Sequence, residues 1–226
     1  MTSRILYLTR HAQAEHNVAE DYSIPDAPLT KLGREQSAKL RKDTENSWTK
    51  EVELLVSSPL RRPMQTFIVG YKPLRERLEK EGKPVVLLPE LSEVNDLPCD
   101  RGSPREVLEA DPEFAGLDFS LLDSAPSRHD GNEWTSKKGF FSPEQVEERA
   151  KWVRRWLRDR KEDKIVVVAH GDILRRLTEV NQTPWANAEV RAYRFESDND
   201  EDALLVKVEE KEQEGGREPT SSEMRN

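Results

Sequence analysis

The chain has 226 residues, enough for one domain with a substantial core. Its 44 acidic residues outnumber its 36 basic residues and give a net charge of −8, which argues against the basic surface typical of nucleic-acid-binding proteins. A single cysteine excludes an internal disulfide, and no apolar stretch is long enough for a signal peptide or a membrane span. These features predict a cytoplasmic protein that binds neither nucleic acid nor membrane.

Short apolar runs bounded by polar residues predict strands that are buried on both faces. Four such runs are expected to form parallel strands, at residues 5–9, 54–57, 85–88 and 165–169. Two further runs with an acidic loop between them predict a hairpin of residues 190–195 and 204–208.

The segments between these runs have helical patterns. Thr30 is a suitable N-cap for a helix that extends to about Trp48. A second helix is expected to begin near Arg61, because Pro63 then occupies its first turn, where the missing N–H costs nothing. A further helix is expected to begin at Asp172.

Residues 143–159 carry the strongest helix signals. Ser142 followed by Gln145 is the pattern of a capping box, and apolar residues recur at helical spacing after it. Strands that alternate with helices are typical of an α/β fold. We therefore expect three layers, with helices on both faces of a doubly wound, mostly parallel sheet.

Residues 96–142 interrupt this alternation. They are rich in Pro, Gly, Asp and Ser but include several aromatic residues, so we expect an insertion that folds over the site and caps it. Within it, Trp134 and Lys137 could belong to a lid, although a packed loop aromatic is the commoner case. The domain is expected to span residues 1–209, because residues 210–226 lack periodicity, have few apolar side chains and are typical of a disordered acidic tail.

Chemically reactive side chains follow two of the predicted strands. Arg10 and His11 come after the first, and His170 comes directly after the fourth. Ligands of open α/β sheets bind beyond the carboxyl ends of the strands. If these two strands are neighbours, both imidazoles and Arg10 meet in one pocket, and that grouping suits an anionic, phosphorylated substrate.

A phosphoryl group can be transferred through a covalent intermediate on a histidine nitrogen. His11 is the candidate nucleophile, and Arg10 and Arg62 supply guanidinium groups whose geometry matches phosphoryl oxygens. His170 supplies a second imidazole, and Asn17 could donate a hydrogen bond to a phosphoryl oxygen. The transfer also needs a carboxylic acid that protonates the leaving oxygen. Four acids beyond the third strand are candidates: Glu90, Glu93, Asp96 and Asp100.

Four segments, in this order, resemble successive motifs of the histidine phosphatase superfamily, the phosphoglycerate-mutase-like proteins. They read LYLTRHAQAEHN, DAPLTKLGREQ, VSSPLRRPMQT and IVVVAHGDILRRL, and the resemblance covers roughly residues 4–196. It implies an α/β fold with a variable insertion over the pocket, and it implies catalysis without a metal or an organic cofactor.

The resemblance also implies a role for individual residues. His11 would be the phosphorylated nucleophile, and Glu93 would be the proton donor. The spacing from Ser58 fits Arg62 rather than Arg61 as the family's arginine. The residues implied for the phosphate pocket are Arg10, Asn17, Arg62 and His170.

One position departs from the family pattern, because Ala12 stands where Gly is usual. A methyl group is tolerated there if the backbone keeps a negative φ and is costly if φ is positive. The choice of acid is also open, since Asp96 and Asp100 compete with Glu93, and Asp100 could instead shape the substrate pocket. A metal site is disfavoured, because the chain has no His-Glu-x-x-His or Cys-x-x-Cys spacing and Arg10 would repel a dication.

These residues favour a metal-independent phosphomonoesterase that acts through a phosphohistidine on a phosphorylated small molecule. One alternative is a phosphoglycerate-type phosphomutase, whose extra basic and aromatic substrate residues have no match here. The other is a non-catalytic protein that binds a phosphate ligand. The identity of the substrate is open. The oligomeric state is open too, and a homodimer is one possibility. His16 and His129 are expected at the surface or behind the site, and Cys99 is expected to be inert.

Overall fold

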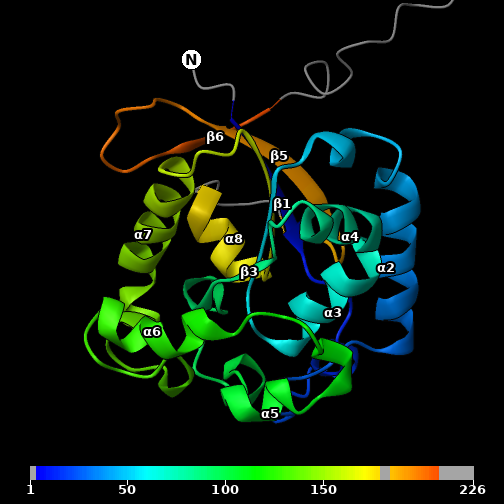
Figure 1. The fold of residues 1–226 in the computed structure, drawn as a ribbon. Helices are drawn as coiled ribbons and strands as arrows, with labels where there is room; N and C mark the ends of the chain where they lie inside the picture. Colours follow the sequence, from blue (N-terminus) through cyan, green and yellow to red (C-terminus); the bar gives the residue numbers. More distant parts are fainter. Residues whose placement is uncertain (1–3, 179–183, 209–226) are drawn as a thin grey trace, which may run out of the picture.

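The structure, a computed structural model, describes residues 4–178 and 184–208 and has a six-stranded sheet with helices on both faces (Figure 1). The strands are β1 (Ile5–Arg10), β2 (Leu54–Ser57), β3 (Val86–Leu87), β4 (Lys164–Ala169), β5 (Val190–Phe195) and β6 (Leu205–Lys207). Their order is β3-β2-β4-β1-β5-β6; the first four are parallel, and β5 and β6 add an antiparallel edge. The predicted α/β sheet is therefore confirmed, whereas the predicted tail of residues 210–226 lies outside the described residues.

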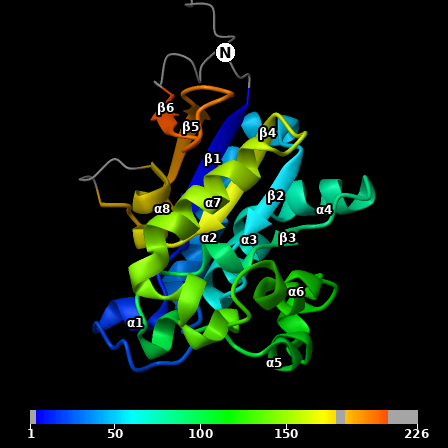
Figure 2. The same cartoon turned by 90° about the vertical axis from the view of Figure 1, so that its left-hand side faces the viewer.

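Two layers of helices cover the sheet. The helices are α1 (Glu15–Val18), α2 (Lys31–Thr44), α3 (Arg61–Gly70), α4 (Lys72–Lys80), α5 (Arg105–Glu109), α6 (Ser120–Arg128), α7 (Val146–Arg158) and α8 (Gly171–Thr178). Helices α2, α3 and α4 lie against one face, and α7 and α8 lie against the other (Figure 1, Figure 2). The side chains of β1 alternate accordingly, because Tyr7 packs into the first layer while Leu6 and Leu8 pack into the second.

The two central strands, β1 and β4, pair in parallel with Arg10 opposite Ala169. The residues that follow them, His11 and His170, therefore leave the sheet side by side at its carboxyl end. Their ring centroids lie 5.2 Å apart. The sheet order thus brings together the two histidines that are 159 residues apart in the sequence (170 minus 11).

The start of α2 agrees with the sequence prediction, and its end does not. Thr30 caps the helix, because its hydroxyl accepts a 2.9 Å hydrogen bond from the amide three residues on. The helix ends at Thr44, and residues Trp48–Glu51 form a separate 3₁₀ turn. The Thr44 carbonyl oxygen accepts hydrogen bonds from the Ser47 amide at 3.1 Å and from the Thr49 hydroxyl at 2.6 Å, so it is satisfied without a further helical turn.

The predicted capping box at Ser142 is wrong. Its side chain makes no capping hydrogen bond, and a 3₁₀ turn of residues Pro143–Gln145 precedes α7. The Gln145 amide, which the Ser142 hydroxyl would have capped, donates instead to the Ser142 carbonyl oxygen at 3.2 Å. The hydroxyl bonds to the Glu144 carboxylate. The tighter backbone turn thus satisfies the amide that the capping box assigned to a side chain.

The inserted segment, residues 96–142, is folded and lies beyond the carboxyl ends of the strands, where α5 and α6 are drawn in green (Figure 1, Figure 2). Trp134 is 3% exposed and packs against Gly102, where an added Cβ would lie 1.8 Å from the indole ring. Near its start the segment also supplies Cys99 and Asp100 to a cavity at this end of the sheet. Its role as a cap over the active site stays a prediction. Further aromatic residues of the segment are buried in the core: Phe114, Phe119 and Phe141.

Gly33 lies in the first turn of α2, where the loop after His11 approaches the helix. A Cβ there would lie 2.0 Å from the backbone carbonyl oxygen of Gln13. We expect Gly33→Ala to lower the free energy of unfolding by about 1–3 kcal/mol and to lower Tm in thermal unfolding. Gly70→Ala is the matched control, because its Cβ would meet the flexible Leu40 side chain at 3.0 Å and the Ser37 carbonyl oxygen at 3.2 Å, which is a milder approach than the 2.0 Å at Gly33. Equal losses of Tm in the two variants would contradict this account.

Candidate active site

His11 follows the last residue of β1, Arg10, and is 2% exposed. Its Nδ1 lies 2.7 Å from the carbonyl oxygen of Ala12, so Nδ1 carries the proton and donates it there, while Nε2 keeps its lone pair. Burial, and after it the charges of Arg62 and Arg10, hold the pKa of His11 well below its usual value. His11 is therefore a neutral imidazole whose Nε2 can act as a nucleophile.

The backbone at Ala12 accommodates the methyl group that replaces the expected glycine. Ala12 is not among the residues with positive φ, so its side chain adds no backbone strain. The residue is fully buried, and its amide donates a 3.0 Å hydrogen bond to the Thr66 hydroxyl on α3. The loop after His11 is thus fixed to the helix that carries Arg62.

Helix α3 places Arg62 against the nucleophile. The side chain is fully buried, and its Nε donates a 3.1 Å hydrogen bond to Nε2 of His11. Nη1 donates to the Cys99 carbonyl oxygen at 2.6 Å, and Nη2 donates to the Asp100 carboxylate at 3.0 Å. The neighbouring Arg61 is directed elsewhere, into an ion pair of 2.6 Å with an aspartate of the inserted segment. The structure thus separates the two arginines in the way that the spacing predicts.

His170 is fully buried, and its Nε2 lies 2.9 Å from the hydroxyl of Ser58, the residue after β2. Nδ1 has no hydrogen-bond partner among the described residues. When Ser58 donates to Nε2, Nδ1 carries the proton and can donate it to a bound oxyanion. Burial and the charge of Arg62 hold the pKa of His170 well below its usual value, so the ring is neutral.

Arg10 and Asn17 also line the cavity. Arg10 donates through Nη1 to the Trp185 carbonyl oxygen, while its Nε is buried with no hydrogen-bond partner in the part of the chain that is described. Asn17 is oriented by its own loop, because Oδ1 accepts a 3.0 Å hydrogen bond from the Ala14 amide and Nδ2 lies 2.9 Å from Nε2 of His16. A side-chain amide has a second N–H, with which Asn17 can bind a phosphoryl oxygen.

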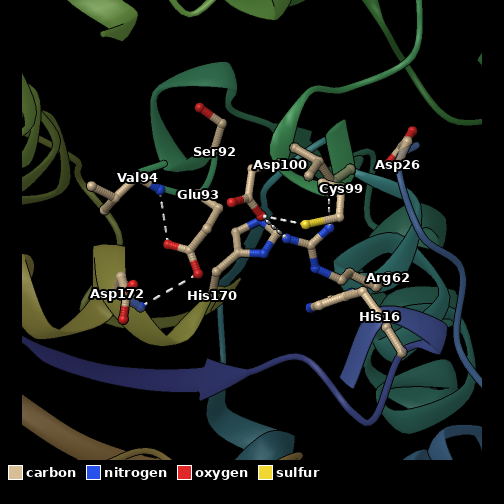
Figure 3. A network of polar contacts seen from close by, with 12 residues as sticks. His16, Asp26, Arg62, Ser92, Glu93, Val94, Cys99, Asp100, His170 and Asp172 are labelled. Carbon is tan, nitrogen blue, oxygen red and sulfur yellow. Dashed lines mark hydrogen bonds and ion pairs between the residues drawn. The ribbon is translucent and has the colours of Figure 1, made fainter. Parts of the chain in front are cut away.

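Glu93 is held at the N-terminus of α8. Its Oε1 accepts hydrogen bonds from the amides of Val94 (2.9 Å) and Ile173 (3.1 Å), and Oε2 lies 3.4 Å from the Asp172 amide. Figure 3 shows the contacts with Val94 and Asp172. Burial, and after it the Asp100 and Asp172 carboxylates, raise the pKa of Glu93 to about 7. Below that pH the side chain is protonated and can give a proton to a leaving oxygen.

The four candidate acids lie in different surroundings. Glu93 and Asp100 line the cavity. Asp96 is exposed and pairs at 2.7 Å with an arginine of its own loop, and fully buried Glu90 lies 2.8 Å from Nε2 of His129. Asp100 accepts a hydrogen bond from a buried arginine, whereas Glu93 accepts hydrogen bonds from backbone amides. His129 lies behind the site, as expected.

Two buried cations contact the backbone at Glu93. Lys137 is 3% exposed, has a left-handed φ of 55° and donates through Nζ to the Glu93 carbonyl oxygen. Arg149, from α7, donates to the Ser92 hydroxyl at 2.6 Å and to the same carbonyl oxygen at 3.3 Å. Burial lowers the pKa of Lys137 to about 7 and that of Arg149 to about 10. The two side chains fix the loop that carries the candidate acid, a role that the sequence pattern did not indicate.

His16 was expected at the surface or behind the site, and the structure places it in the cavity wall. It is 6% exposed, and its ring centroid lies 6.0 Å from that of His11. Burial lowers the pKa of His16 to about 4, so it is neutral above that pH. The spacing in HAQAEH was the sequence signal that could have indicated this position of His16, because the single turn of α1 folds the chain back beside the nucleophile. Further residues of the wall were also missed, among them Tyr22, Arg175 and Trp185.

The cavity that Arg10, His11, Glu93 and Asp100 line has a volume of about 350 Å³. Within residues 4–178 and 184–208, no group of three or more His, Cys, Asp or Glu side chains is arranged to hold a metal ion. None of the helices in those ranges combines the length and the apolar character that a membrane crossing requires. Cys99 is 1% exposed, and burial raises the pKa of its thiol to about 12, so it does not ionise near neutral pH.

Comparisons with known proteins agree with this geometry. The model of the histidine phosphatase superfamily (branch 1) matches residues 6–199. A phosphoglycerate mutase-like protein 1 from Arabidopsis thaliana is 30% identical over 204 residues, which cover 76% of this chain and 69% of that protein.

Solved structures of low sequence identity share the fold. The α-ribazole phosphatase from Shigella flexneri has a TM-score of 0.53 at 18% identity and covers 90% of this chain and 94% of its own. A mycobacterial glucosyl-3-phosphoglycerate phosphatase has a TM-score of 0.51 at 19% identity and covers 91% of this chain and 97% of its own. Because the family model matches most of the sequence, the chain belongs to the histidine phosphatase superfamily (branch 1), whose members are phosphatases or mutases.

Proposed function

We propose that the protein is a metal-independent phosphomonoesterase that transfers a phosphoryl group first to His11 and then to water. The observation that carries this proposal is the neutral Nε2 of His11, 3.1 Å from Nε of the buried Arg62. A nucleophilic nitrogen beside a fixed guanidinium is the arrangement that phosphoryl transfer requires. Arg10 Nε and His170 Nδ1, both buried with no hydrogen-bond partner among the described residues, supply further donors.

In the first step, Nε2 of His11 forms a bond to phosphorus while the P–O bond of the ester breaks in line with it. Glu93 gives its proton to the leaving oxygen, so that the alcohol departs neutral. Arg10, Arg62 and His170 donate to the phosphoryl oxygens and offset the charge that they carry in the transition state.

In the second step, the Glu93 carboxylate takes a proton from a water molecule. The water oxygen forms a bond to phosphorus while the P–N bond to His11 breaks. Inorganic phosphate leaves, and both His11 and Glu93 return to their starting protonation states. One water molecule is consumed for each ester that is cleaved.

A small phosphorylated molecule is the proposed substrate class, since a cavity of about 350 Å³ lies within the size range of small-ligand sites. Hydrolysis is proposed rather than a mutase reaction, and the names of the α-ribazole phosphatase and the glucosyl-3-phosphoglycerate phosphatase support it. The buried thiol of Cys99 is compatible with a reducing, cytoplasmic setting.

The test combines phosphate release from small phosphomonoesters, measured with a chelator present, with trapping of the phosphoenzyme at alkaline pH, where phosphohistidine survives. We expect release to persist without metal. We also expect the peptide that follows Arg10 to gain one phosphoryl group, which mass-spectrometric fragmentation assigns to His11 rather than to His16. Turnover that depends on a metal, or no phosphorylated His11, would overturn the proposal. Transfer to a sugar or glycerate acceptor without phosphate release would favour the mutase.

A further inference from the structure

An acidic side chain accepts a hydrogen bond from the arginine that is proposed to bind the phosphoryl group. Asp100 is 4% exposed, and its Oδ1 accepts a 3.0 Å hydrogen bond from Nη2 of Arg62 (Figure 3). Asp100 also lines the cavity. A carboxylate at that place repels a phosphoryl dianion unless it moves or takes up a proton.

A guanidinium has two edges that can bind an oxyanion in a fork, and for Arg62 the relevant edge is the one beside His11. Nε and Nη2 share this edge, and two parallel N–H bonds from it match a carboxylate or a phosphoryl group. Nη1 lies on the other side and is held by the Cys99 carbonyl oxygen at 2.6 Å. In the structure the fork meets His11 through Nε and Asp100 through Nη2. A phosphoryl group next to Nε2 of His11 therefore competes with Asp100 for the fork.

We propose that the Asp100 carboxylate takes the place of a phosphoryl oxygen on Arg62 when no ligand is bound. When an oxyanion binds, Asp100 releases its hydrogen bond to Arg62 and takes up one proton. The inference rests on the proposed function, because it concerns the same phosphate pocket. Asp100 is then a residue that sets the affinity of the pocket for the phosphoryl group and for product phosphate. It takes no part in making or breaking a bond to phosphorus.

The charges around Asp100 agree with proton uptake. Arg62 on α3 and Lys137 in the inserted segment face it and favour its ionised form. Glu93, when it is ionised, faces it with the same charge, and the thiol of Cys99 lies 3.5 Å from Oδ1. Burial outweighs the two cations and raises the pKa of Asp100. When Nη2 turns to a ligand, the carboxylate loses that hydrogen bond and protonation becomes easier.

The proton that balances this exchange comes from the solvent. A protonated Asp100 has an O–H that can donate to the bound oxyanion, so the carboxyl group and the ligand share one proton instead of repelling each other. Oxyanion binding should therefore weaken as the pH rises and Asp100 resists protonation. Replacing Asp100 by asparagine removes the charge, keeps the size and leaves an N–H that can donate.

The experiment measures sulfate binding to the full chain by titration calorimetry at pH 6 and pH 8. Sulfate is the probe because it stays doubly ionised over this range and undergoes no turnover. We expect Asp100→Asn to tighten sulfate binding about tenfold at pH 8 and to have a smaller effect at pH 6. Titrations in two buffers of different ionisation enthalpy should show that the wild type takes up about one proton more than the variant.

Asp96→Asn is the matched control, since it removes a charge from the same segment but outside the cavity, and it should bind sulfate like the wild type. Unchanged or weaker sulfate binding by Asp100→Asn, or equal proton uptake, would overturn the inference. General damage to the fold lowers affinity and so cannot mimic a gain. Because sulfate binding does not require catalysis, this result is independent of whether the protein hydrolyses phosphomonoesters.

Discussion

Replacing Arg62 by lysine is expected to lower kcat/KM for phosphomonoester hydrolysis by about 10²–10³-fold. Lysine keeps the positive charge but loses the planar fork, so it cannot reach the positions of Nε beside His11 and Nη2 at the same time. The loss should appear with every substrate of a panel, because the contact is with the phosphoryl group that all of them share.

Arg61→Lys provides the matched control, because the two arginines are neighbours on the same helix. Arg61 pairs at 2.6 Å with Asp111, whereas Arg62 donates to His11. Such partly exposed ion pairs contribute little to stability, so its replacement should leave kcat/KM within about threefold of the wild type. Similar losses in the two variants would contradict the assignment of the phosphate pocket to Arg62.

The strands could be predicted from the sequence because they are short apolar runs with polar ends, and the histidines that follow β1 and β4 could be placed with them. The third strand is shorter than predicted, at Val86–Leu87. The Leu88 amide still donates a 2.8 Å hydrogen bond to the Ser57 carbonyl oxygen, and a 3₁₀ turn begins at Pro89 directly after it.

The contacts that tune the site could not be predicted, because they join segments that no local pattern relates. Lys137 meets the Glu93 carbonyl oxygen across 44 residues of chain, and its left-handed backbone is unusual for a residue with a side chain. Asp100 was one of several acids in a loop, and only the packing of the inserted segment directs it to Arg62. Periodicity reports which face of an element is buried, not which buried polar groups meet.

Replacing Glu93 by glutamine is expected to lower kcat about 10²–10⁴-fold for an alkyl phosphate, whose alkoxide needs a proton to leave. The loss in the first step should be much smaller for p-nitrophenyl phosphate, because nitrophenolate leaves without protonation. The second step also needs the Glu93 carboxylate to activate water. With this substrate the variant should therefore release one equivalent of nitrophenolate in a burst and accumulate phosphorylated His11.

The pH dependence gives a second readout for Glu93. Its pKa is raised to about 7, and the first step requires the protonated form. For an alkyl phosphate, kcat/KM of the wild type should therefore be highest at acidic pH and fall as the pH rises through about 7. Glu93→Gln should lose the part of this fall that Glu93 causes and keep the weaker binding at high pH that Asp100 causes. Asp96→Asn, which removes an exposed carboxylate outside the cavity, should keep both the profile and the rate. A wild-type rate that keeps rising above neutral pH, or a variant that neither slows nor accumulates phosphohistidine, would assign the proton transfer to another group.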